Sequence, residues 1–180
     1  MGAGILPTTI YKGKLYFLFG KENRYADTPG WSDFGGGTDN NESYLQTAMR
    51  EGSEELTGFL GNKNSIKSLL SKGSYYLDNK QGYRMFLFPY PYDPMLPIYY
   101  NNNHKYIEEK LDKEIIKKSK IFEKCEIKWV CIDDLNKMKS NCRSYFKNTI
   151  DDLLEKREDI YRFIKKKSNI HSRTKKTFLK

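Results

Sequence analysis

The sequence predicts an α/β protein, a mixed α/β sandwich that is extended at the C-terminus by a basic helical segment. Three observations support this class. Runs rich in β-forming residues occur in pairs joined by short turns, which is typical of hairpins. Amphipathic helical segments are placed irregularly between those pairs, and no segment repeats. A doubly wound parallel sheet, which needs regular alternation of strands and helices, is therefore not expected.

The first half of the chain predicts a hairpin, a long loop and a helix. The hairpin covers residues 8–19 around a Lys-Gly-Lys turn, and the loop covers 20–37 and ends in the sequence WSDFGGG. Apolar residues at helical spacing then predict a helix over 43–56. The residues expected on its apolar face are Leu45, Ala48, Met49 and Leu56.

The second half predicts another hairpin and then mostly helices. The hairpin spans 73–92, and a proline-rich loop follows through Pro94 and Pro97. The remaining elements are an amphipathic helix over 104–119, a strand over 124–132, a short helix or turn opening at 133–135, and a final helix over 146–167. We therefore expect a main domain over residues 1–145, and a C-terminal helix and basic tail over 146–180 packed on the same domain.

Size and composition indicate one globular domain. The chain has 180 residues, of which 38% are hydrophobic and 31% charged, enough to bury a core. No apolar run approaches the length that spans a bilayer, and Met1 to Pro7 lack the basic region of a signal peptide. Three cysteines without a C-x-x-C pair indicate free thiols in a reducing compartment. We therefore expect a cytoplasmic protein with no membrane segment.

The formal net charge of +9 is concentrated at the C-terminus. Residues 161–180 contain eight basic residues and no acidic residue, so the remainder of the chain is nearly neutral. The eight are Arg162, Lys165, Lys166, Lys167, Arg173, Lys175, Lys176 and Lys180. Such a segment is either a solvated tail or an arm that holds RNA or another polyanion through phosphate contacts. Both interpretations stay open at this point.

Three acids in the predicted helix over 43–56 suggest a cation site. Glu51, Glu54 and Glu55 are spaced i, i+3 and i+4, so they share one helical face and repel one another. Divalent cations relieve that repulsion, and carboxylate oxygens suit Mg²⁺ or Mn²⁺. An acidic solvent-facing helix is the plainer interpretation of these three residues alone.

A glycine run precedes that helix. Gly35, Gly36 and Gly37 permit backbone conformations that other residues resist, so a carbonyl there can turn toward the same cations. Mg²⁺ usually keeps waters and completes its shell with substrate phosphates. A carboxylate cluster beside a glycine-rich loop therefore predicts a site in which water attacks a diphosphate.

The spacing of these residues resembles the Nudix hydrolase family, whose motif is G-x5-E-x7-R-E-U-x-E-E-x-G-U, with U aliphatic. The matching positions are Gly36, Glu42, Arg50, Glu51, Glu54 and Glu55. The motif covers about 23 residues, and the flanking hairpin, the sequence WSDFGG and the late sequence EIKWVCIDDL resemble the family's order. The resemblance implies a Nudix-type α/β/α sandwich, with helices on both faces of a mixed β-sheet, and a Mg²⁺- or Mn²⁺-dependent pyrophosphohydrolase.

The resemblance also implies roles for individual residues. Glu54 and Glu55 would bind metal, with Glu55 the central ligand, and Glu51 would bind metal or help activate water. Gly35 would offer its carbonyl to metal. Arg50 would orient the acids through an ion pair with Glu42 or Glu51, while Gly36 and Glu42 would be structural. Many family members add an acid ahead of a late tryptophan strand, and Glu123 and Glu126 are both candidates because they precede Trp129.

Two positions depart from the motif. Gly52 stands where an aliphatic residue is expected, which costs helix propensity and side-chain packing, so Gly52→Ala should be neutral or stabilising on propensity alone. Thr57 stands where the closing glycine is expected, and Gly58 follows it. We expect the helix to run one residue longer before a glycine cap. Neither departure removes a carboxylate.

The substrate beyond the diphosphate stays open, because specificity lies in loops. A 5′-capped RNA fits the basic tail and the 14 tyrosines that could stack on a base. The bias toward Lys, Asn, Ile and Tyr suggests an AT-rich genome, and large DNA viruses carry Nudix decapping enzymes. This substrate is slightly favoured.

Three alternatives to the cleavage of capped RNA remain, two of them other substrate classes and one a function without catalysis. The first is a small nucleotide, dinucleoside polyphosphate or nucleotide sugar, which fits the nearly neutral body. The second is a diphosphoinositol polyphosphate, which needs cations around the pocket; the candidates are Lys14, Lys21, Arg24 and Arg84. The third is a Nudix-fold protein that binds RNA or a partner without cutting, which three repelling acids disfavour.

Overall fold

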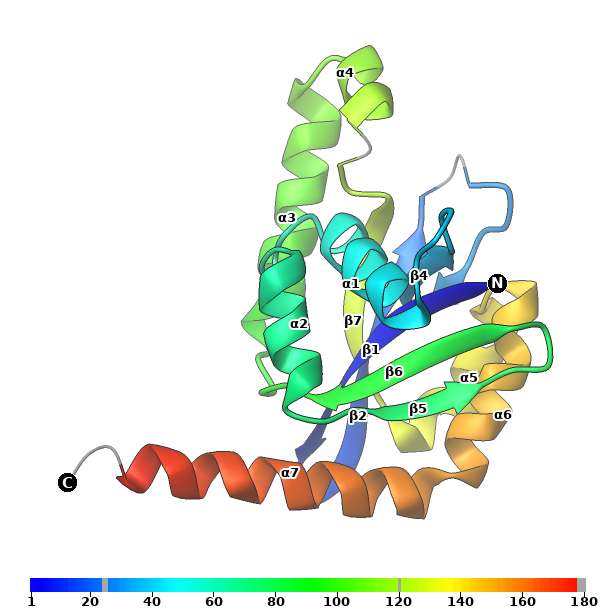
Figure 1. Cartoon of the computed structure of the whole chain (residues 1–180). Coiled ribbons are helices and arrows are strands. Elements are labelled where there is room, and N and C mark those ends of the chain that lie inside the picture. The colour runs from blue at the N-terminus through cyan, green and yellow to red at the C-terminus, as the bar shows by residue number, and fades with distance from the viewer. Residues whose placement is uncertain (24–25, 120, 178–180) are drawn as a thin grey trace.

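A mixed β-sheet forms the centre of the molecule (Figure 1). The computed structural model describes residues 1–23, 26–119 and 121–177. The described strands are β1 (Gly2–Tyr11), β2 (Lys14–Glu22), β3 (Trp31–Ser32), β4 (Phe34–Gly37), β5 (Tyr75–Asp78), β6 (Tyr83–Pro89) and β7 (Lys124–Cys131). Their order is β3-β2-β1-β6-β5, with β4 also paired to β1 and β7 to β2. β1 and β6 run parallel, and the other pairs are antiparallel.

Strand β1 changes partner along its length. Its second half pairs with β2 in the predicted first hairpin, whereas its first half, Gly2–Ile5, pairs with β4. The glycine run 35–37 thus belongs to a sheet strand and not to the loop expected over 20–37, because paired glycines in β1 and β4 allow the two backbones to meet. The second predicted hairpin is confirmed as β5 and β6.

Helices cover both faces of the sheet, which confirms the predicted sandwich. The described α-helices are α1 (Tyr44–Glu55), α2 (Lys63–Ser71), α3 (Met95–Lys110), α4 (Lys113–Ser119), α5 (Leu135–Met138), α6 (Lys147–Glu155) and α7 (Arg157–Thr177). Residues of α1, α2 and α3 share one hydrophobic core cluster with the sheet. Residues of α5, α6 and α7 share a second cluster, so these helices lie on the other face (Figure 1).

The C-terminal helices belong to the body of the molecule. Phe146, Ile150, Ile160 and Ile164 are buried in the same cluster as Leu6 of β1. The single helix expected over 146–167 is two helices that meet at Lys156, and the second continues to Thr177. Of the eight basic residues, Arg162, Lys165 and Lys166 are exposed and Lys167 is half-buried. The side chains of Arg173, Lys175, Lys176 and Lys180 lie outside the described part.

Two helices differ from expectation. The loop predicted through Pro94 and Pro97 is the start of α3, because Pro94 caps the helix and Pro97 lies in its first turn, where no intrahelical N–H is needed. Helix α2 has no counterpart among the predicted elements; the Asn62 side chain caps it, and Ile66 and Leu70 are its buried residues. Among the residues expected on the apolar face of α1, Leu45 is exposed.

The cysteines and the apolar character of the helices are both subjects of prediction. None of the three cysteines, all of which are described, forms a disulfide. Within the described residues, no helix is both long and apolar enough to span a membrane.

Candidate active site

Helix α1 begins at a capping box. The Ser43 hydroxyl accepts the backbone N–H of Gln46, and the Gln46 side chain accepts the backbone N–H of Ser43. Reciprocal bonds of this kind satisfy N–H groups that a helix start leaves unpaired. The first turn is therefore fixed, and with it the direction in which Glu51 and Glu54 point.

Arg50 is the centre of an ion-pair network. Its guanidinium donates to Glu42 at 3.0 Å, to Glu51 at 2.7 Å and to Glu54 at 3.3 Å. It also donates to the carbonyl oxygen of Gly37 at 2.9 Å, which joins α1 to β4. The hydrogen bond from Arg50 lowers the pKa of Glu42 to about 2, and the bond to Glu42 raises the pKa of Arg50. The ion pairs expected with Glu42 and with Glu51 both occur.

The glycines of β4 permit close approach. A Cβ atom on Gly35 would lie 2.0 Å from the Tyr83 hydroxyl oxygen, and one on Gly36 would lie 2.6 Å from a carboxylate oxygen of Glu51. Any side chain at either position would displace those groups. Gly37, and not Gly35, contributes to the pocket described below. The role of the Gly35 carbonyl in metal binding stays a prediction.

The end of α1 corrects the expected cap. Thr57 itself adopts the left-handed conformation, with φ of +50°, and Gly58 follows with φ of +75°. The N–H of Thr57 donates to the Glu54 carbonyl at 2.8 Å, and the N–H of Gly58 donates to the Ser53 carbonyl at 3.0 Å. This pair of bonds is a Schellman motif with threonine in the position usually taken by glycine. The helix therefore ends where the motif places its end, and the extra residue expected before the cap is wrong.

Gly52 is a point of close packing. A Cβ atom there would lie 2.4 Å from Cδ1 and 2.8 Å from Cγ1 of Ile5, a fully buried residue of β1. The apolar group missing from the helix is thus supplied by the strand beneath it. Ile5 therefore restores the packing that a glycine at position 52 was expected to forgo.

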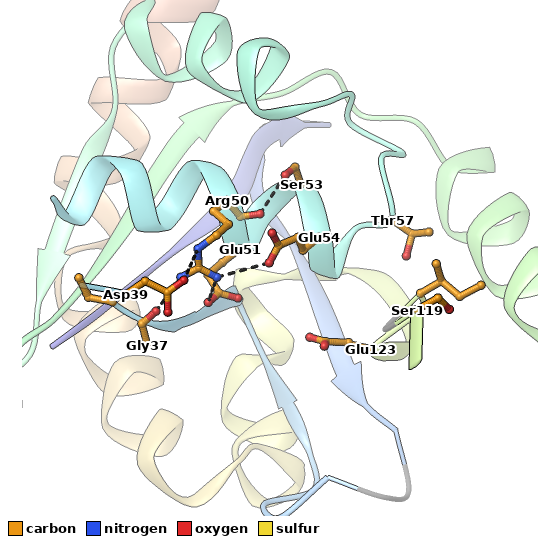
Figure 2. A pocket seen from close by; sticks show the side chains of 11 residues that line it. Gly37, Asp39, Arg50, Glu51, Ser53, Glu54, Thr57, Ser119 and Glu123 are labelled. Carbon is orange, nitrogen blue, oxygen red and sulfur yellow. Dashed lines mark hydrogen bonds and ion pairs between the residues drawn. The ribbon is translucent and has the colours of Figure 1, made fainter. Parts of the chain in front are cut away.

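Acidic side chains line a cavity of about 800 Å³ beside α1 (Figure 2). Its acids are Asp39, Glu51 and Glu54 from the motif region and Glu123 from the chain just before β7. Figure 2 shows the Glu123 carboxylate pointing back toward Glu51 and Glu54. The other lining residues are Gly37, Thr38, Arg50, Ser53, Thr57, Ser119 and Ile121. The size lies within the range of small-molecule sites.

Glu55 does not line this pocket. The residue is buried, and one carboxylate oxygen lies 3.1 Å from the ammonium nitrogen of Lys124, a residue with a fully buried side chain. Lys124 also contacts Glu22 and donates to the Ser32 hydroxyl at 3.1 Å. The second carboxylate oxygen of Glu55 is buried without a hydrogen-bond partner in the described structure. The residue expected as central metal ligand is thus held by an internal cation.

Burial shapes the charges of these acids. Burial raises the pKa of Glu55 to about 8 despite the attraction of Lys124, and it raises the pKa of Asp33 to about 6. Burial alone would lower the pKa of Lys124, but Glu55 and Glu22 offset it, so the ammonium stays charged. Burial also raises the pKa of Glu51, against the lowering effect of Arg50. A carboxylate with a raised pKa can accept a proton from water near neutral pH.

The two candidates for the additional acid lie in different places. Glu123 lines the pocket, whereas Glu126 is in β7 and forms an ion pair with Lys21 at 3.6 Å. The pairing of β7 with β2 places Glu126 directly opposite Lys21. Glu123 is therefore the candidate that the fold brings to Glu51 and Glu54.

The cations proposed for a polyphosphate substrate are engaged elsewhere. Lys14 pairs with Asp133, Lys21 with Glu126, and Arg84 with Asp78. None of the three lines the pocket, and Arg24 lies outside the described residues.

The donor set of the pocket fits a hard divalent cation. Carboxylate and carbonyl oxygens are the ligands that Mg²⁺ and Mn²⁺ prefer, and the pocket's lining offers the carboxylates of Asp39, Glu51, Glu54 and Glu123. Across the described part of the chain, no three His, Cys, Asp or Glu side chains converge enough to enclose a metal by themselves. A cation here would therefore share its shell between protein, water and substrate phosphate.

Four residues of this site are not identified by the sequence pattern. Lys124 and Glu22 are 102 residues apart, so no local pattern could pair them. Thr57 stands at the position of the motif's closing glycine, and that position is the signal that could have indicated its left-handed conformation. Asp39 follows the glycine run, and its closeness in sequence to Glu42 is the signal that could have identified it as a further acid.

The comparisons with known proteins identify the fold. No family model matches the chain, and no curated protein matches it. The crystal structure of an Ap4A hydrolase from C. elegans, in a binary complex, is similar at 18% identity and TM-score 0.51, covering 88% of this chain and 96% of that one. A Nudix hydrolase from M. smegmatis, RenU, is similar at 15% identity and TM-score 0.51, covering 88% and 86%. The chain therefore has the Nudix fold.

Proposed function

We propose that this Nudix-fold chain is a Nudix hydrolase, a pyrophosphohydrolase that depends on Mg²⁺ or Mn²⁺ and cleaves a diphosphate linkage in a nucleotide-containing substrate. The observation that carries the proposal is the cavity of about 800 Å³ whose lining includes Glu51, Glu54 and Glu123. The motif spacing and the shared fold both support it.

The residues take distinct roles in this proposal. Glu54, Glu55 and Glu123 would hold the divalent cation. The cation supplies neutralisation of the diphosphate charge and makes nearby water more acidic. Glu51, with its pKa raised by burial, accepts the proton of the attacking water. Arg50 keeps Glu51 and Glu54 in place through the ion pairs at 2.7 and 3.3 Å.

The proposed reaction is a hydrolysis in which one bond forms and one bond breaks. The water oxygen forms a bond to one phosphorus, and the bond between that phosphorus and the bridging oxygen breaks. The departing phosphate takes the electron pair, and the water proton passes to the carboxylate base. Two phosphate-bearing products result.

A protein that binds without cutting is the alternative of another class. The repulsion among the motif acids and the extra acid Glu123 in the same pocket disfavour it, since a binding surface for RNA would present cations there. Arg50 is the basic residue of the pocket's lining, and acids occupy its guanidinium.

Capped RNA is the substrate that we propose first. The exposed Arg162, Lys165 and Lys166 of α7 and the other basic residues of 161–180 offer phosphate contacts. Because α7 lies on the opposite face of the sheet from α1, RNA held there would pass around the edge of the sheet to reach the pocket.

A small molecule is the alternative substrate. The nearly neutral body needs no polyanion, and one protein of the same fold is an Ap4A hydrolase. A dinucleoside polyphosphate is therefore the first small molecule to test. Diphosphoinositol polyphosphates are disfavoured because Lys14, Lys21 and Arg84 form ion pairs outside the pocket.

The test of the proposed function compares two glutamates of the same strand region. Glu123→Gln should lower Mn²⁺ affinity and turnover, while Glu126→Gln, which removes only an ion pair with half-exposed Lys21, should leave both near wild type. Equal losses in the two variants would remove Glu123 from the site. Glu54→Gln should abolish turnover, and normal turnover in that variant would contradict the proposed function.

A further inference from the structure

The segment that carries Glu123 is fastened to the end of α1 on both sides. On one side, the N–H of Phe122 donates to the Thr57 hydroxyl oxygen at 3.0 Å. On the other, the Tyr100 hydroxyl lies 2.9 Å from the Lys124 carbonyl oxygen and 3.0 Å from that of Glu55. Glu123 lies between these two attachments, so they limit where its carboxylate can go.

Both partners of the first attachment are strained. Thr57 and Phe122 have φ of +50° and +54°, in the left-handed region that β-branched and bulky residues rarely adopt. Glycine would take the Thr57 conformation without strain, and the family motif has glycine at this position. A helix cap alone does not need threonine here, because its two backbone bonds would form equally well with glycine.

The hydroxyl is what threonine adds. It accepts the N–H of Phe122, a largely buried residue whose ring lies 5.1 Å from the Tyr100 ring and 6.3 Å from the Phe59 ring. Thr57 also lines the pocket that Glu123 enters (Figure 2). Strained residues that persist at a functional site usually serve the site.

We propose that Thr57 is a positioning residue that, together with Tyr100, holds the Glu123 carboxylate where it contributes to divalent-cation binding. The inference rests on the proposed function. Thr57 touches neither substrate nor cation in this role; it acts through the backbone of Phe122. Threonine in place of the motif's glycine thus strains the end of α1 and, in return, fixes the position of Glu123.

The test measures Mn²⁺ affinity by electron paramagnetic resonance, without substrate, alongside thermal unfolding of the protein without added metal. Thr57→Val keeps the shape and the strain but removes the acceptor. Thr57→Gly removes both the acceptor and the strain. Mn²⁺ affinity should fall about 10-fold in each, a loss typical of removing a group that orients a ligand. Thr57→Gly should melt higher than Thr57→Val, because only the valine variant keeps the strain.

A double variant makes the test specific to Glu123. In a Glu123→Gln background, Thr57→Gly should cause no further loss of Mn²⁺ affinity, because the carboxylate that it positions is gone. In the same background, Tyr100→Phe should also cause no further loss of Mn²⁺ affinity. As a matched control, Lys12→Gly relieves a left-handed residue, φ +49°, in the turn between β1 and β2, and it should leave Mn²⁺ affinity unchanged.

Two results would overturn the inference. One is wild-type Mn²⁺ affinity in both Thr57 variants. The other is a loss that adds to that of Glu123→Gln in the double variant. Either result, obtained with wild-type protein that hydrolyses a diphosphate, leaves the proposed function standing, whereas absence of turnover with intact Mn²⁺ binding overturns the proposed function alone.

Discussion

Among the motif acids, Glu55 is the one whose pKa burial raises furthest. Its side chain is 6% exposed, one oxygen faces Lys124, and the other lacks a partner among the described groups. Burial raises its pKa from the ordinary 4.5 to about 8. A protonated carboxylic acid at neutral pH costs less to bury than a carboxylate, and it becomes a strong cation ligand once the proton leaves.

Replacing Glu55 by Gln should stabilise the fold at alkaline pH and abolish turnover. Between pH 4.5 and 8 the unfolded chain has lost the Glu55 proton while the folded chain keeps it, so this group lowers stability as pH rises. Glutamine does not titrate. In metal-free buffer, Glu55→Gln should therefore gain at least about 1 kcal/mol over wild type between pH 5 and pH 9. Denaturant unfolding at the two pH values measures the gain.

Turnover gives the second readout for Glu55. A loss of more than about 100-fold is expected, beyond what removing a partner of a ligand costs. Near-normal turnover would remove Glu55 from cation binding, and a stability difference that does not change with pH would contradict its raised pKa.

Gly52→Ala should destabilise the protein, in contrast to the gain expected from helix propensity. The added methyl carbon would lie 2.4 Å from Cδ1 and 2.8 Å from Cγ1 of the buried Ile5. Overpacking costs about 1–3 kcal/mol, and two overlaps this close place the cost above the roughly 1 kcal/mol of helix propensity gained. Ile5→Val removes the Cδ1 atom. The double variant Gly52→Ala, Ile5→Val should therefore be more stable than the sum of the single changes predicts. Additive effects would mean that the two residues do not compete for space.

At the scale of elements, Lys124 joins strand β7 to helix α1 and strand β2. Its ammonium group contacts Glu55 of α1 and Glu22 of β2, and its stem occupies space left by Gly20, where a Cβ atom would lie 2.8 Å from Lys124 Cγ. Arg143 also contacts Glu22. The buried charges are therefore satisfied only while these elements stay together.

Lys124→Met should destabilise the protein by about 3–5 kcal/mol, because it removes one of the cations that contact the buried Glu22. The matched control is Lys128→Met in the same strand. Lys128 is half-buried with its ammonium 3.9 Å from the centre of the Trp31 ring, and its loss should cost about 1 kcal/mol. Urea unfolding at pH 7 measures both. Equal costs would show that the buried acids do not depend on Lys124.

Elements with local signals could be predicted, and those that depend on distant partners could not. The hairpins, α1 and β7 follow from alternation, turn residues and helical spacing, all of which are local. The predicted start of α3 is wrong because Pro94 and Pro97 indicate a loop unless they fall at a helix start. The strand character of 34–37 depends on Gly2–Ile5, which no pattern in the glycine run reveals.

The site, like the fold, could be predicted where the signal is local and could not where it depends on distant partners. The motif spacing identifies Glu51, Glu54 and Arg50, and the pocket contains them. Spacing could not show that Glu55 faces inward or that Glu123, and not Glu126, enters the pocket, because both facts follow from how β7 meets α1 and β2.

At the scale of the whole molecule, the basic helix and the acidic pocket lie on opposite faces of the sheet. Helix α7 contributes Ile160 and Ile164 to one core cluster, while Ala48 and Leu56 of the α1 region belong to the other. The two features can therefore be altered separately, provided that a truncation spares the buried Ile164.

Removing residues 168–180 should keep the fold and weaken RNA binding. Deletion of 161–180 would remove the buried Ile164 and confuse the two effects, whereas 168–180 begins after Ile164. The shorter deletion removes four of the eight basic residues. The salt dependence of binding to single-stranded RNA should flatten by about 0.7 for each phosphate that the shortened protein no longer neutralises. Unchanged affinity together with unchanged melting temperature would mean that this segment does not hold RNA.

Product analysis tests the central claim most directly. The protein is incubated with Mg²⁺ or Mn²⁺ and either cap-labelled RNA or a panel of nucleotides, dinucleoside polyphosphates, nucleotide sugars and diphosphoinositol polyphosphates, with chelator and Glu54→Gln as controls. We expect two phosphate-bearing products from at least one diphosphate, with none in chelator or in the variant; capped nucleotide released from RNA would identify a decapping enzyme. Absence of products from every substrate, or products that persist in chelator and in Glu54→Gln, would contradict the assignment of this chain as a metal-dependent pyrophosphohydrolase.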